Sequence, residues 1–115
     1  DYLVGSGPMA EAAVSILRAR GASDDIKVVS TYLSHAVYRG VKRGRILAAP
    51  TDSPVVQGRL AIEMAVRALE GTLEIQHAGP PIWVVTPETA TQEVIDGSLA
   101  PASFIPVFSL LPLAP

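Results

Sequence analysis

Tyr32 and Asp52 are the two side chains that this sequence places best for contact with a ligand. Each follows a strand-like run, at 26–31 and at 45–50. Open α/β sheets bind ligands at the edge where their parallel strands end, so an exposed phenol ring there can contact a bound molecule. For Asp52 two interpretations stay open: contact with a ligand, or capping of a helix that begins at Pro54.

Catalysis and metal binding find less support in the residues. The chain contains no Cys and only 2 His. Tyr32, His35 and Tyr38 gather after the second strand-like run, but no Ser pairs with His35 and an acid as in a hydrolase. Two His are too few for a convincing metal site, and His35 is interpreted as a first-turn helix residue. We therefore expect no enzyme activity, no metal and no cofactor.

The segment Gly5-Ser6-Gly7-Pro8-Met9-Ala10 matches a loose form of the dinucleotide-binding fingerprint. That fingerprint needs an acidic residue at the end of the second strand, where this chain has Ser30-Thr31-Tyr32. Pro8 also removes one of the backbone donors that would hold a phosphate. We favour a turn that begins a helix, and keep a nucleotide-binding enzyme domain as a lesser alternative.

Composition limits the protein to one domain with a core. The chain has 115 residues, of which 49% are hydrophobic and 17% charged, and a formal net charge of −2. A nucleic-acid-binding domain normally carries a basic face, so we expect no nucleic-acid partner. No apolar run reaches the about 18 residues of a membrane span. Because the chain begins at Asp1 and not at Met, we expect a mature or cut segment.

Strands and helices are predicted to alternate. The expected strands are 2–5, 26–31, 45–50 and 82–86, and the expected helices are 8–20, 34–43, 54–70 and 87–96. Such alternation favours a parallel sheet, with every strand-to-helix junction at one edge. The helix at 54–70 is expected to bury a stripe of Val56, Leu60, Met64 and Leu69. From Gly97 onward the density of Pro predicts an extended tail.

The order of these elements resembles the C-terminal lobe of type I periplasmic binding proteins, the ribose-binding class shared with LacI-type regulators. Ser6-Gly7-Pro8-Met9-Ala10 corresponds to the loop after one strand of that class, and Ser30-Thr31-Tyr32 to the end of the next. Asp52-Ser53-Pro54, with Gly58 four residues after the Pro, corresponds to a third segment.

A narrower resemblance connects the chain with periplasmic sensor proteins for trimethylamine N-oxide. It rests on the run 32–44 (Tyr-Leu-Ser-His-Ala-Val-Tyr-Arg-Gly-Val-Lys-Arg-Gly) and continues through Gln57-Gly58, Glu70-Gly71 and 80–87. It covers most of residues 1–96. The resemblance implies an α/β fold, a three-layer αβα sandwich with a mostly parallel sheet of about four strands. It also implies a partial C-terminal lobe over 1–96, followed by a Pro-rich tail over 97–115.

The resemblance further implies a ligand site formed by Ser6, Tyr32 and Asp52. These residues stand where the sugar-binding members carry Asn, Asp and Gln, and all three differ here. An aromatic face suits the methyl groups of trimethylamine N-oxide, which surround a positive nitrogen. Ser6 is expected to donate a hydrogen bond, and Asp52 to face the cationic end.

The family's role implies a periplasmic location and a membrane sensor histidine kinase as partner. It implies a further N-terminal lobe, which this chain does not contain. Without the neighbouring segments, exposed apolar surface makes self-association an expected property. The alternatives are the effector-binding lobe of a LacI-type transcription regulator and a sugar-binding protein of an ABC transporter.

Overall fold

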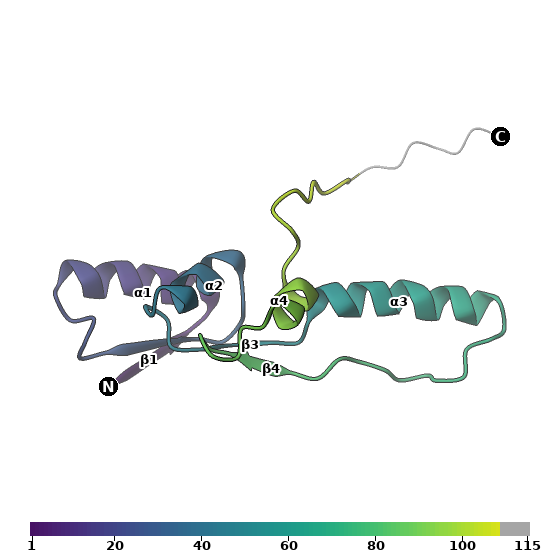
Figure 1. The fold of residues 1–115 in the computed structure, drawn as a ribbon, viewed down its shortest axis with the longest axis horizontal. Coiled ribbons are helices and arrows are strands. Elements are labelled where there is room, and N and C mark those ends of the chain that lie inside the picture. The colour runs from purple at the N-terminus through teal and green to yellow at the C-terminus, as the bar shows by residue number, and fades with distance from the viewer. Residues whose placement is uncertain (109–115) are drawn as a thin grey trace.

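A computed structural model describes residues 1–108 of the chain. Strands and helices alternate, and Figure 1 shows the strands below a layer of helices. The elements are β1 (Tyr2–Gly5), α1 (Gly7–Ala19), β2 (Lys27–Ser30), α2 (His35–Lys42), β3 (Ala49–Thr51), α3 (Pro54–Leu69), β4 (Trp83–Val85) and α4 (Gln92–Ser98). This order confirms the α/β class that the sequence predicts.

Neighbouring strands are consecutive in the chain, but they do not all run in one direction. β1 and β2 are parallel, with Leu3 opposite Val28, and one parallel bridge joins Val29 of β2 to Ala48, the residue before β3. β3 and β4 are antiparallel. The end of β4 therefore lies at the opposite edge of the sheet. The expectation that all four strand-to-helix junctions share one edge is wrong for the junction at Thr86.

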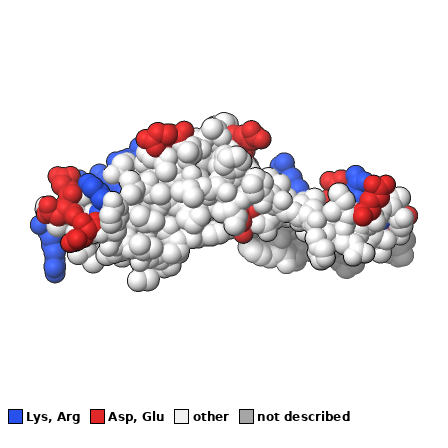
Figure 2. All heavy atoms as spheres, turned by 90° about the horizontal axis from the view of Figure 1, so that it is seen from below, with Lys and Arg blue, Asp and Glu red and all other residues white. Residues whose placement is uncertain are grey.

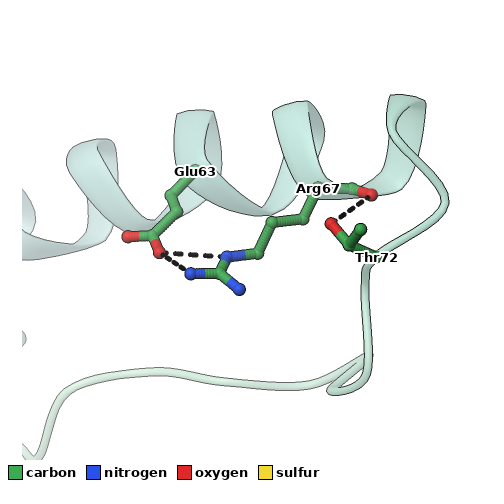
Figure 3. A network of polar contacts seen from close by, with 3 residues as sticks. All are labelled: Glu63, Arg67 and Thr72. Carbon is green, nitrogen blue, oxygen red and sulfur yellow. Dashed lines mark hydrogen bonds and ion pairs between the residues drawn. The ribbon is translucent and has the colours of Figure 1, made fainter.

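The course of α3 accounts for this reversal. Figure 1 shows α3 extending beyond the strands, with the following segment running back beneath it to β4. At the end of α3, Thr72 Oγ1 donates to the Arg67 carbonyl oxygen over 3.4 Å, beside an Arg67–Glu63 ion pair of 2.7 Å (Figure 3). The chain then re-enters the sheet from the edge at which β3 ended, so β4 runs antiparallel.

α3 does not form the core stripe expected for it. None of its residues is buried, and Leu69 is 89% exposed. Leu60 and Met64 are partly covered by residues 73–78, which line a cavity with them. The spacing of the apolar residues is that of a helix with one half-covered face. α3 packs mainly against α4.

The core lies between the strands and one layer of helices. Parallel crossovers are right-handed, so two successive crossovers in the same direction place α1 and α2 on the same face. The core comprises Ala10, Val28, Leu33, Val37, Val41, Ile46, Ala49, Val85 and Val94. On the other face of β1, Tyr2 is 72% and Val4 62% exposed. Seen from below, this side has a broad uncharged middle with charged atoms at its margins (Figure 2).

Local signals fix most helix ends as the sequence predicts. Pro8 and Pro54 stand in the first turns of α1 and α3, where the missing N–H is not needed. The glycines that follow α1, α2 and α3 all have positive φ, which ends each helix without steric cost (Gly21, Gly44 and Gly71). The Ser34 hydroxyl accepts a hydrogen bond from the Val37 amide over 3.1 Å and caps α2.

α4 begins later than the sequence predicts. The Thr89 hydroxyl donates to the Val84 carbonyl oxygen over 2.6 Å and accepts from the Thr86 amide over 2.8 Å. This turn occupies the expected first helical residues, and α4 starts only after its cap at Thr91. Gly97 and Ser98, expected to begin the tail, belong to α4. Residues 109–115 of the expected tail lie outside the described part. None of the helices in residues 1–108 is long and apolar enough to span a membrane.

Candidate ligand site

The structure brings Tyr32 and Asp52 into direct contact. The Tyr32 hydroxyl donates a hydrogen bond to Asp52 Oδ1 over 2.7 Å. Both residues follow strands that end at the same edge, because β2 and β3 are parallel neighbours. Tyr32 is 45% exposed, so much of its ring is open to a ligand. The two residues singled out from the sequence therefore form one polar group at the predicted edge.

Tyr32 is held by the buried end of β2. Ser30 Oγ donates to the Tyr32 carbonyl oxygen over 2.8 Å and accepts from the Tyr32 amide over 3.4 Å. The next residue, Leu33, is buried and donates its amide hydrogen to the Pro50 carbonyl oxygen over 2.9 Å. These contacts attach the turn to β3, and so they fix the ring beside the residue that follows β3.

Asp52 is held partly by α3. Gln57 Nε2 donates to the Asp52 carbonyl oxygen over 2.6 Å, which ties the first turn of α3 back to the end of β3. The Asp52 side chain bonds to Tyr32, while Ser53 is the residue at the N-cap position of α3. Asp52 therefore does not cap α3, and its contact with a ligand stays a prediction. Sequence reasoning did not select Gln57, although its place in the first turn after Pro54 is the signal that could have done so.

The hydrogen bond polarises the pair. The Tyr32 hydroxyl holds the pKa of the Asp52 carboxyl below its ordinary value, with a further contribution from Gln57. The bond to Asp52 in turn raises the pKa of the Tyr32 phenol, with burial and the charge of Asp52 adding to the effect. At neutral pH the site thus presents an anionic carboxylate beside a neutral phenol. Such a pair attracts a cationic or dipolar ligand.

A cavity of about 420 Å³, lined by both apolar and polar atoms, adjoins Asp52. Its walls come from the first half of α3 and from the segment leading into β4, and they include Asp52, Gln57, Leu60, Met64, Pro80 and Ile82. The two polar residues stand at the end of α3 nearest the strands, while the remaining walls are aliphatic. This combination suits a small ligand that carries both a charged centre and methyl groups.

Ser6 lies at the same edge, and its hydroxyl makes no hydrogen bond to Tyr32 or Asp52. β1 is the other neighbour of β2, and the Thr31 amide donates to the Gly5 carbonyl oxygen over 2.9 Å beside it. Ser6 is exposed, and its hydroxyl makes no capping bond to α1. Its role as a ligand donor stays a prediction.

The Gly5–Ala10 turn is shaped by packing. A Cβ atom at Gly5 would lie 3.0 Å from the Met9 Cβ, so this glycine lets α1 fold back closely on β1. Pro8 occupies the first turn of α1, which leaves fewer amide donors for a phosphate. These contacts support the interpretation as a helix-starting turn.

His35 has a structural partner. Its Nε2 lies within hydrogen-bonding distance of the Ala100 carbonyl oxygen, at 2.8 Å. This contact joins the start of α2 to the segment after α4. Among residues 1–108 no three His, Asp or Glu side chains gather as metal ligands.

Comparison with known proteins identifies relatives of high similarity. The periplasmic protein TorT of Escherichia coli K12 is 45% identical over 108 residues, which cover 94% of this chain and 31% of TorT. The chain thus spans about a third of the length of this relative. No protein-family model matches the chain.

Solved structures agree with the sequence comparison. The TorS sensor domain–TorT complex with trimethylamine N-oxide contains a chain with 45% identity and a TM-score of 0.88, covering 95% of this chain and 37% of that one. A solute-binding protein of an ABC transporter from Bradyrhizobium, with bound bis-tris, has 41% identity and a TM-score of 0.83, over 94% and 32% of the two chains. These relatives are named as binding and periplasmic proteins, not as enzymes. Over the matched residues, this chain is a homologue of TorT with the fold of a periplasmic-binding-protein lobe.

Proposed function

We propose that this chain is part of a periplasmic solute-binding sensor protein that binds trimethylamine N-oxide or a similar small methylated amine. The observation that carries the proposal is the Tyr32–Asp52 hydrogen bond at the strand ends, beside a cavity lined mainly by apolar side chains. The proposed role is reversible binding and signalling, not catalysis. A membrane sensor kinase is the proposed partner, since the solved homologue is in complex with the TorS sensor domain.

The chemistry of the site matches the two ends of this ligand. The methyl groups carry the positive charge of the nitrogen and favour an aromatic face and a carboxylate. Tyr32 and Asp52 supply these groups. The oxide needs donors, and a carboxylate cannot supply one. Gln57 has a second amide hydrogen, and Ser6 has a free hydroxyl at the same edge, so we assign the oxide end to these residues.

The Bradyrhizobium relative binds a molecule with an amine nitrogen. Its bound bis-tris shares with trimethylamine N-oxide a nitrogen with three carbon substituents, and it also carries five hydroxyl groups. A sugar site needs several side chains that bind hydroxyl groups in pairs. The walls of the cavity beside Asp52 are mainly aliphatic.

An amide NMR titration of the 115-residue chain tests the proposal, with ribose and NAD as comparison ligands. We expect trimethylamine N-oxide alone to shift the signals near Tyr32, Asp52 and Gln57, at millimolar concentration because the chain spans only a third of TorT. Asp52→Asn is expected to weaken these shifts, whereas Ser15→Ala on the exposed side of α1 is the control. Shifts with NAD around Gly5 would replace the proposal with the nucleotide alternative. A spectrum that responds to none of the ligands would overturn the assignment of the site.

A further inference from the structure

We infer that a buried pair of hydroxyls, Thr51 and Ser98, positions the Asp52 carboxylate through the turn that follows β3. Asp52 belongs to the proposed ligand site, so the importance of this device for binding rests on the proposed function. The claim that the two hydroxyls position Asp52 concerns the protein without a ligand. It makes α4 a positioning element of the site, although α4 contributes no side chain to it.

A continuous chain of hydrogen bonds carries the inference. The Ser53 amide donates to Thr51 Oγ1 over 3.1 Å. The Thr51 hydroxyl donates to Ser98 Oγ over 2.9 Å, and the Ser98 hydroxyl donates to the Val94 carbonyl oxygen over 2.6 Å. Each hydroxyl proton therefore has an acceptor, and the order of donors along the chain is unambiguous.

The chain of bonds is shielded from water. Thr51 is 1%, Ser98 3% and Ser53 4% exposed. Breaking one of these bonds would leave a buried polar group without a partner, which is unfavourable. Hydrogen bonds in such surroundings are also directional constraints, because water cannot replace a lost partner. Asp52 lies between two residues, Thr51 and Ser53, that are both held in this way.

The backbone of Ser53 shows that the turn is under constraint. Its φ of 55° and ψ of 61° are left-handed, and it is the one non-glycine residue with positive φ in residues 1–108. A non-glycine residue keeps this conformation only where its surroundings determine it. The bond from its amide to Thr51 is one such determinant, and the conformation turns the chain from β3 into α3 directly after Asp52.

α4 and the residues just after it are hydrogen-bonded to neighbours of both site residues. Through Ser98 it reaches the Asp52 turn, and just beyond its end the Ala100 carbonyl oxygen meets His35, three residues after Tyr32. Gly97 lets α4 approach closely, since a Cβ there would lie 3.1 Å from Val56 Cγ2. A shift of α4 would therefore disturb the contact between Tyr32 and Asp52.

The test compares Thr51→Val, which removes the hydroxyl but keeps the shape, with Thr51→Ser, which keeps the hydroxyl. Carbon NMR measures the pKa of the Asp52 carboxyl without any ligand, and amide titration measures the affinity for trimethylamine N-oxide. We expect Thr51→Val and Ser98→Ala to raise this pKa toward its ordinary value and to weaken binding about threefold or more. Thr51→Ser is expected to restore both values, and Ser15→Ala to leave both unchanged.

The two readouts separate this inference from the proposed function. If the unsubstituted chain does not bind trimethylamine N-oxide, the proposed function fails, and the titration of Asp52 still tests the positioning. An unchanged Asp52 titration in folded Thr51→Val and Ser98→Ala would overturn the inference. If neither variant folds, hydrogen exchange of the unsubstituted chain provides the test. Slow exchange of the Ser53 amide supports the hydrogen bond from Ser53 to Thr51. Exchange of this amide at the rate of an open loop overturns the inference.

Discussion

The hydrogen bond between Tyr32 and Asp52 is expected to stabilise the fold only within a certain range of pH. The folded protein lowers the pKa of Asp52, so the bond stabilises the fold above the ordinary value of about 4 and is lost as pH falls through the folded value. The folded protein raises the pKa of Tyr32, so the bond is kept below about 10 and is lost as pH rises through the folded value. The hydrogen bond thus contributes to the stability of the fold between these two pH limits.

Tyr32→Phe is the direct test of this coupling. It removes the hydroxyl, the main cause of the lowered Asp52 pKa, and we expect this pKa to rise toward its ordinary value. Urea unfolding is expected to show a smaller loss of stability between pH 7 and pH 3 than in the unsubstituted protein. Tyr38→Phe in α2, a partly buried ring that packs against the core beside Lys42, is the control. An Asp52 titration that is the same in both variants would contradict the assignment.

At the scale of single residues, the sequence predicts that Tyr32 and Asp52 lie together, but it does not predict the buried hydrogen bonds that hold them. Tyr32 and Asp52 follow strands whose ends are recognisable, and parallel neighbours bring such ends together. The contact of Thr51 with Ser98 spans 47 residues. It depends on the antiparallel direction of β4 and on the late start of α4, and neither has a local signal strong enough to predict it.

Among the glycines in residues 1–108, Gly40 of α2 has the closest neighbour, the side chain of Ile46 in the segment before β3. A Cβ atom at Gly40 would lie 2.7 Å from Ile46 Cδ1, and Ile46 is 1% exposed. Ile46 cannot move without disturbing the core around it. The glycine is therefore a packing residue in the middle of a helix, where its own helix propensity is poor.

Gly40→Ala is expected to destabilise the fold. Overpacking costs about 1–3 kcal/mol, which exceeds the about 1 kcal/mol that Ala gains over Gly in a helix. Gly58→Ala in α3 is the matched control, because a Cβ there meets nothing within 4 Å, and it is expected to raise stability. Thermal unfolding of the two variants measures the difference. A higher melting temperature for Gly40→Ala would show that Ile46 is free to move.

Helix ends are predicted well because their causes are local. Pro at the start, Ser34 as a cap and glycines of positive φ at the ends all act within a few residues. Burial is predicted poorly for α3. The apolar periodicity of its sequence identifies the face that other residues can cover, but it does not show which residues cover that face. In residues 1–108 the main neighbours of that helix are α4 and the segment before β4.

For the whole molecule, the relation to TorT explains the amount of exposed apolar surface. The matched chain is 31% of TorT, so in the relative many further residues are present to pack against this lobe. Here Val4 and Val84 lie on the sheet face opposite the helices and are 62% and 56% exposed. β1 also has no strand on its outer side in residues 1–108, and such edges pair readily with other chains.

The 115-residue chain is therefore expected to self-associate as its concentration rises. Sedimentation velocity over a dilution series measures this, and Val4→Lys is expected to shift the protein toward the monomer. The change removes little packing, because Val4 is largely exposed, and it places a charge on the edge strand, which opposes pairing. Ala12→Lys, at an exposed position of α1, adds the same charge on another surface and so controls for the change in net charge. A monomer at all concentrations, or equal effects of the two lysines, would show that this face does not mediate association.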